Sequence, residues 1–146
     1  MLALDQRNFS DAEERLRRYR EGGGTRASAL SALAEAVKGQ GRWRESGQLY
    51  AEALEVTQDP DDAIHAARMA ALAGQHHLAI ERINRAIGTL GPAVSLRVVR
   101  VEILEGAGKV DKAAEELGEL LKLAPNHTAW RHHHLELTQR LSERKP

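Results

Sequence analysis

Residues 41–54 read GRWRESGQLYAEAL, and the pattern of this stretch occurs in three further copies along the chain. Its central small residue is Ser46, and the equivalent residues are Ala12, Ala79 and Ala113, which gives spacings of 34, 33 and 34. Five residues earlier, three copies have glycine and the first has arginine: Gly41, Gly74, Gly108 and Arg7. Glycine suits a tight turn between two helices. A period of this length predicts a helical repeat protein.

The positions around the small residue recur with helical spacing. Three residues before it stand Phe9, Trp43, His76 and Val110, and four residues after it stand Leu16, Tyr50, Ile83 and Leu117. Such spacing places them on one helix face. Twelve residues after it, Gly24, Gln58, Gly91 and Pro125 are expected to end the helix. The pattern predicts helices over about 8–22, 26–39, 43–58, 61–73, 76–89, 93–106, 110–123 and 128–143.

With these residues, the chain resembles the tetratricopeptide repeat (TPR) family, whose unit is a pair of antiparallel helices. Residues 41–54 and 108–125 fit the family pattern best, while Ser46, Gln58 and Arg100 depart from it. The resemblance implies an all-α fold: a right-handed α-solenoid of stacked antiparallel helix pairs, with about eight helices. It further implies three full repeats and a half-repeat at each end.

The expected organisation is a single domain over residues 1–146. It comprises a partial repeat at about 2–24, repeats at about 27–59, 60–92 and 93–126, and a C-terminal capping helix at about 128–143. Leu2, Ala3 and Leu4 are expected in the last turn of a preceding helix, so that the chain starts in mid-repeat. A fragment of a longer solenoid is favoured over an opening helix that packs on another subunit.

Both terminal helices carry specific expectations. On the first, Phe9, Leu16 and Tyr19 are expected to form an exposed face that could mediate a homodimer. On the last, Thr128 is expected as N-cap, with Trp130, Leu135 and Leu141 as the packing side.

Small residues at the repeat centre have a mechanical role. Ala34, Ala67 and Val101 on the first helices are expected to face Ser46, Ala79 and Ala113 on the second helices. Short side chains allow the helix axes to approach to the close end of ~8–10 Å. A phenylalanine in place of Ala79 is expected to cost on the order of 1–3 kcal/mol or more.

Composition narrows the function classes. The 21 basic and 21 acidic residues balance to zero formal charge, which disfavours binding to nucleic acid, including the groove of RNA-reading pentatricopeptide repeats. The absence of cysteine excludes disulfides and thiolate metal sites. No membrane span or secretion signal is visible, so a cytoplasmic location is expected. The Ala, Arg, Gly and Leu usage suits a GC-rich bacterium.

Features that suggest catalysis or ligand binding have simpler interpretations. The glycines of residues 22–25 lack the lysine and preceding strand of a phosphate-binding loop, and a turn is favoured. Histidines occur at 76–77 and 132–134 but never at the i, i+4 spacing of a helical metal site, so a solvated polar face is favoured. No catalytic residue, metal or cofactor is expected, and the chain is not expected to be an enzyme.

The resemblance places partner contacts on the first helix of each repeat. Carried over position by position, it implies a groove lined by Ser28, Ser31, Glu35, Lys38, Asp61, Ile64, His65, Arg68, Ser95, Val98, Glu102 and Glu105. The cationic clamp of chaperone adaptors is replaced by Ser31, Glu35, His65, Ser95 and Val99, so an acidic tail peptide is not expected to bind. A peptide with basic and apolar residues is expected instead.

The sequence therefore predicts a non-catalytic scaffold that holds a peptide or helix of a partner protein. The alternative is the repeat region of a larger enzyme, such as a glycosyl- or sulfotransferase, in which the solenoid recruits substrate. Fold alone does not separate these roles.

Overall fold

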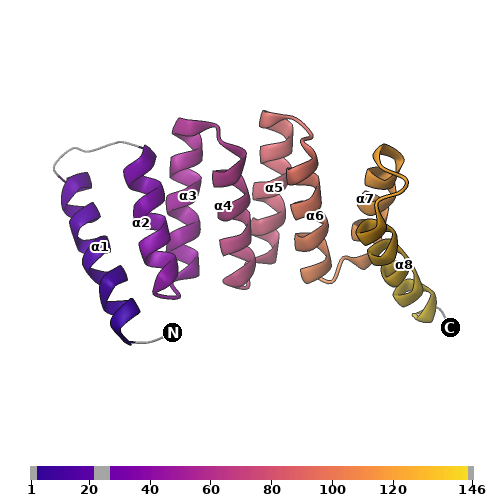
Figure 1. Cartoon of the computed structure of the whole chain (residues 1–146), viewed down its shortest axis with the longest axis horizontal. Helices are drawn as coiled ribbons and strands as arrows, with labels where there is room; N and C mark the ends of the chain where they lie inside the picture. Colours follow the sequence, from indigo (N-terminus) through magenta and orange to yellow (C-terminus); the bar gives the residue numbers. More distant parts are fainter. Residues whose placement is uncertain (1–2, 22–26, 145–146) are drawn as a thin grey trace. The chain divides into compact units, whose positions relative to one another are not determined.

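The computed structural model describes residues 3–21 and 27–144, and every regular element in these ranges is an α-helix (Figure 1). The helices are α1 (Ala3–Glu21), α2 (Ala27–Gly39), α3 (Trp43–Thr57), α4 (Pro60–Leu72), α5 (His76–Leu90), α6 (Val94–Gly106), α7 (Val110–Leu123) and α8 (Thr128–Glu143). The all-α prediction is confirmed. From α2 onward, the observed bounds differ from the predicted ones by at most one residue.

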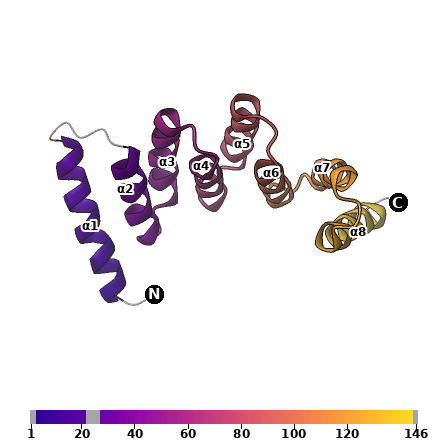
Figure 2. The same ribbon diagram turned by 45° about the horizontal axis from the view of Figure 1, so that its top comes forward.

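The described residues group into two compact units, one up to Arg82 and one from Ile83 onward. In the first unit α1 packs on α2, α2 on α3 and α3 on α4. In the second unit α6 packs on α7, and α7 lies beside α8 (Figure 2). Within each unit, neighbours in sequence are thus neighbours in space, as expected for hairpin repeats.

The recurring glycines build the same turn three times. Gly41, Gly74 and Gly108 have φ of 76°, 77° and 79°, in the left-handed region that side chains disfavour. Each donates its N–H to the carbonyl three residues earlier, at 2.9, 3.0 and 3.0 Å. The turns predicted from the glycine spacing are therefore confirmed.

The first copy lacks this turn, and two predictions about it are wrong. The helix predicted to begin at residue 8 begins at Ala3, and Ala3 and Leu4 belong to α1 rather than to a preceding helix. Arg7 stands where the other copies have glycine, and an L-residue does not favour the left-handed conformation, so the helix continues through it. Leu2 and the glycines of residues 22–25 lie outside the described residues.

The small residues at the repeat centre lie in the core, as predicted. Ala34, Ala67, Ser46, Ala79 and Ala113 have no exposed surface, and Val101 is 2% exposed. The Ser46 hydroxyl donates to the carbonyl oxygen of Ala34 at 2.7 Å, so α2 and α3 meet closely at this point.

The last helix differs from its prediction at the N-cap and on its packing side. The N-cap is His127 rather than Thr128, because its Nδ1 accepts the N–H of Trp130 at 3.2 Å. Leu137 is fully buried, whereas Leu135, predicted to pack, is 59% exposed. At 100° per residue, Leu137 lies about 20° from Trp130 around the helix and Leu135 about 140° away.

Candidate functional site

The twelve predicted groove residues all have accessible surface, as contact residues must. Eight lie on α2 and α4 in the first unit, and four lie on α6 in the second. The exposed ones are Ser28, Glu35, Asp61, Arg68, Ser95 and Glu102, and the partly buried ones are Ser31, Lys38, Ile64, His65, Val98 and Glu105.

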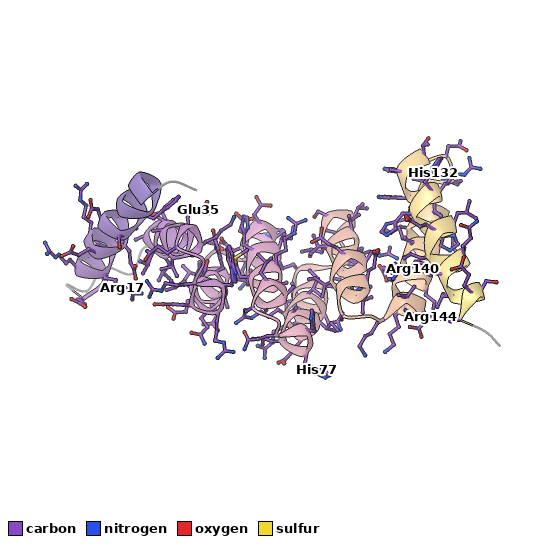
Figure 3. All side chains as sticks on the ribbon, turned by 90° about the horizontal axis from the view of Figure 1, so that it is seen from below. Arg17, Glu35, His77, His132, Arg140 and Arg144 are labelled. Atoms are coloured by element: carbon purple, nitrogen blue, oxygen red, sulfur yellow. The ribbon has the colours of Figure 1, made fainter. Side chains whose placement is uncertain are left out.

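In the first unit, Tyr50 of α3 brings two of these residues together. Its hydroxyl donates to Glu35 Oε2 at 2.7 Å, and its ring stacks on His65 with centroids 4.8 Å apart. Burial, aided by the hydrogen bond to Glu35, raises the pKa of Tyr50, so the phenol stays protonated and remains a donor. Exposed Glu35 of α2 is therefore hydrogen-bonded to α3 through one carboxylate oxygen; Figure 3 labels this residue.

Asp62 of α4 is a polar residue that sequence reasoning missed. It is 8% exposed and accepts hydrogen bonds from Ser31 Oγ at 3.3 Å and Thr57 Oγ1 at 2.7 Å. These bonds connect α2, α3 and α4, which fixes the position of predicted groove residue Ser31. The repeat spacing contains no signal for Asp62, because both its donors come from other helices.

In the second unit, a hollow of about 490 Å³ opens between α6 and α8. Its lining includes three of the four predicted α6 residues, and α7 contributes Leu117. The lining residues are Val98, Val101, Glu102, Glu105, Gly106, Leu117, Trp130, His133 and Arg140. The hollow thus combines an apolar wall with two carboxylates, an imidazole and a guanidinium.

Glu105 connects α6 to α8 across this hollow. Its Oε1 lies 2.5 Å from His133 Nε2, and its Oε2 lies 3.7 Å from Arg140 Nη1. All three side chains remain about one third to one half exposed. Figure 3 shows Arg140 on α8 between His132 and Arg144.

His133 corrects the prediction that residues 132–134 form a solvated polar face. His132 is exposed, but His133 is partly buried and bonded to Glu105. A sequence signal existed: His133 is three residues after Trp130 and four before Leu137, so it shares their face of α8.

Arg100, a departure from the family pattern, lies in a second ion cluster. Glu116 accepts from Arg97 Nε at 2.7 Å and from Arg100 Nη2 at 2.8 Å, and Arg100 also donates to Asn84 at 3.3 Å. The charges are paired across α6 and α7. The role of this cluster is therefore structural: it holds α6 against α7.

The predicted dimer face of α1 is only partly available. Leu16 packs against the core cluster formed with α2, α3 and α4. The ring of Phe9 lies so close to Gly39 that a Cβ there would sit 2.4 Å from it. Tyr19, at 44% exposure, is the predicted face residue that stays open. Phe9 and Leu16 occupy the same repeat positions in α1 as Trp43 and Tyr50 in α3. This equivalence explains why they pack toward α2.

Other site classes gain no support from the described residues. Among the side chains that the structure describes, no three of His, Cys, Asp or Glu converge as a metal-binding group would. No helix within residues 3–21 and 27–144 combines the length and apolar character needed to cross a bilayer. Val99, at one position of the chaperone clamp, is 3% exposed and faces the core.

Comparisons with known proteins support the repeat fold. The sequence matches no protein-family model, and no curated protein matches it. Its structure is similar to the crystal structure of a thermophilic TPR protein from Thermus thermophilus, with a TM-score of 0.64 and 18% identity. The match covers 93% of this chain and 76% of the other. The chain therefore has a TPR-like α-solenoid fold.

Proposed function

We propose that the chain is a non-catalytic interaction module that binds a peptide or helix of a partner protein. The α6–α8 hollow carries this proposal. Its volume of about 490 Å³ lies within the roughly 300–1,000 Å³ typical of ligand pockets, and apolar walls with a few polar groups are typical too.

The apolar wall of the hollow favours a partner that inserts an apolar side chain into it. Val98, Val101, Leu117 and Trp130 line the hollow, and aromatic residues such as tryptophan often dominate binding energy at interfaces. One or two partner side chains buried there would gain roughly 1.5–3 kcal/mol each.

The charged side chains around the hollow favour a partner with a basic residue next to that apolar side chain. Glu105 presents to the hollow a carboxylate that is about one third exposed, and its Oε2 lies 3.7 Å from Arg140 Nη1. In the first unit, the hydrogen-bonded carboxylate of Glu35 offers a comparable partner for a cation. A substrate-recruiting role within a larger enzyme would use the same surfaces.

Selection of a random peptide library on the full chain at pH 7.5, followed by fluorescence anisotropy, tests this proposal. Val98→Asp places a carboxylate in the wall and should weaken binding of the selected peptides about tenfold or more, a change of roughly 1.4 kcal/mol. Val94→Asp is the matched control, because Val94 is 45% exposed on the same helix and outside the hollow.

Two results would refute the proposal. One is a library that yields no binding peptide, and the other is equal weakening by both substitutions. Circular dichroism of each variant verifies that the helices remain formed.

A further inference from the structure

The carboxylate of Glu105 has a partner within the protein, on the opposite side of the hollow. His133 Nε2 lies 2.5 Å from Glu105 Oε1 and spans the hollow from α8 to α6. Arg140 approaches the other oxygen less closely, at 3.7 Å. A basic group on a bound peptide that paired with Oε1 would compete with His133 for that oxygen.

The strength of this internal contact depends on the charge of the imidazole. A neutral imidazole donates one hydrogen bond to the carboxylate, whereas the imidazolium adds the attraction between opposite charges to that bond. Histidine side chains change charge between about pH 8 and pH 5. The imidazole of His133 is therefore a weaker competitor for Glu105 when neutral than when protonated.

The other charged groups around His133 leave Glu105 as its closest partner. From α6 the hollow receives Glu102 and Glu105, from α8 it receives Arg140, and from α7 it receives the uncharged Leu117. His132, His134 and Glu136 line a different hollow, together with Leu121 and Leu135.

We propose that His133 is a specificity-determining residue that competes with a basic group of the bound peptide for Glu105, so that peptide binding weakens in mild acid. This inference rests on the proposed peptide-binding function and adds the partner chemistry and its regulation. The imidazole yields Glu105 to the peptide when neutral and holds it when protonated.

The test uses the full chain and a library-selected peptide that contains a basic residue, with affinity measured at pH 7.5 and pH 5.5. The wild-type chain should bind about 3- to 10-fold more weakly at pH 5.5, because an imidazolium holds the Glu105 carboxylate more strongly than a neutral imidazole does. His133→Asn should abolish the pH dependence. His132→Asn, the same change on the neighbouring exposed histidine, should retain it.

A second peptide, with citrulline in place of arginine, removes the charge at nearly constant shape. It should bind more weakly at pH 7.5 and show little pH dependence. Equal pH dependence in wild type and His133→Asn, or in the arginine and citrulline peptides, would overturn the role of His133 and leave peptide binding intact. Selected peptides that all lack a basic residue would overturn it too. Absence of binding at both pH values would overturn both proposals.

Discussion

The hydroxyl of Ser46 on α3 donates a hydrogen bond to the main-chain oxygen of Ala34 on α2, across 2.7 Å and with neither residue exposed. The two helices meet where both side chains are short. The place of alanine in the repeat pattern is thus taken by a residue of similar size that adds one hydrogen bond.

Ser46→Leu should destabilise the chain by about 1–3 kcal/mol, because the added carbons have no room between α2 and α3. Ser46→Ala should lower the free energy of unfolding by only about 0.5–1.5 kcal/mol, the value of one hydrogen bond. Urea unfolding followed by circular dichroism measures both. Similar losses for the two variants would show that the hydrogen bond, rather than space, governs this contact.

Gly39→Ala should loosen α1 from α2. A Cβ at Gly39 would lie 2.4 Å from the ring of Phe9, so the ring has to move. Gly88→Ala is the matched control: no atom lies within 4 Å of the added Cβ, and alanine should stabilise the helix by about 0.5–1 kcal/mol. Hydrogen exchange should increase in α1 for Gly39→Ala alone, and unchanged exchange there would contradict the packing of Phe9.

Glu116→Ala should destabilise the second unit by about 1–3 kcal/mol, because it leaves the partly buried guanidiniums of Arg97 and Arg100 without their shared carboxylate. Glu119→Ala removes an exposed pair with Lys122 and should leave the thermal midpoint nearly unchanged. Thermal unfolding, followed by circular dichroism, measures the midpoint of both variants. If Glu119→Ala lowered the thermal midpoint as much as Glu116→Ala, the ion pairs of Glu116 would not be the source of the stability.

Acid should weaken the contact of α1 with residues 40–42, between α2 and α3, through Glu13. Burial disfavours the carboxylate, but hydrogen bonds from Gln40, Arg17 and Arg42 outweigh burial and hold the pKa of Glu13 below its ordinary value. A lowered pKa contributes stability above the pKa of the unfolded chain, and this contribution is lost as pH falls through the lower folded-state value.

The free energy of unfolding should therefore decline below about pH 4.3, the ordinary glutamate value. Glu13→Gln should reduce this decline, whereas Glu14→Gln should not, since the Glu14 pair with Arg18 is exposed. Denaturant unfolding between pH 3 and pH 6 tests the difference. Identical profiles for the two variants would remove Glu13 from the explanation.

The fold could be predicted because its determinants are local and repeated. A glycine in the left-handed conformation and a short residue five positions later recur in three copies, and those copies have the predicted turns and buried centres. The predicted start of the first helix was wrong because Arg7 stands where the other copies have the turn glycine. Prediction also failed at His127, because an imidazole accepts an N-cap hydrogen bond only in one tautomer and orientation.

The candidate site was predictable only in part. The α6 residues Val98, Glu102 and Glu105 followed from their repeat positions. The partner of Glu105 did not, because His133 lies 28 residues away and outside the repeat pattern. Such pairs depend on the rotation of α8. The predicted packing side of Trp130, Leu135 and Leu141 was wrong at Leu135, which is exposed, and it omitted Leu137, which is buried.

The most direct test of the peptide-binding account uses the two tryptophans, since Trp130 lines the hollow and Trp43 does not. Their indole N–H signals can be followed by NMR while a library-selected peptide is titrated into the full chain at pH 7.5. We expect the Trp130 signal to shift and saturate while the Trp43 signal stays in place. A saturating shift of Trp43 with a stationary Trp130 would contradict the peptide-binding proposal.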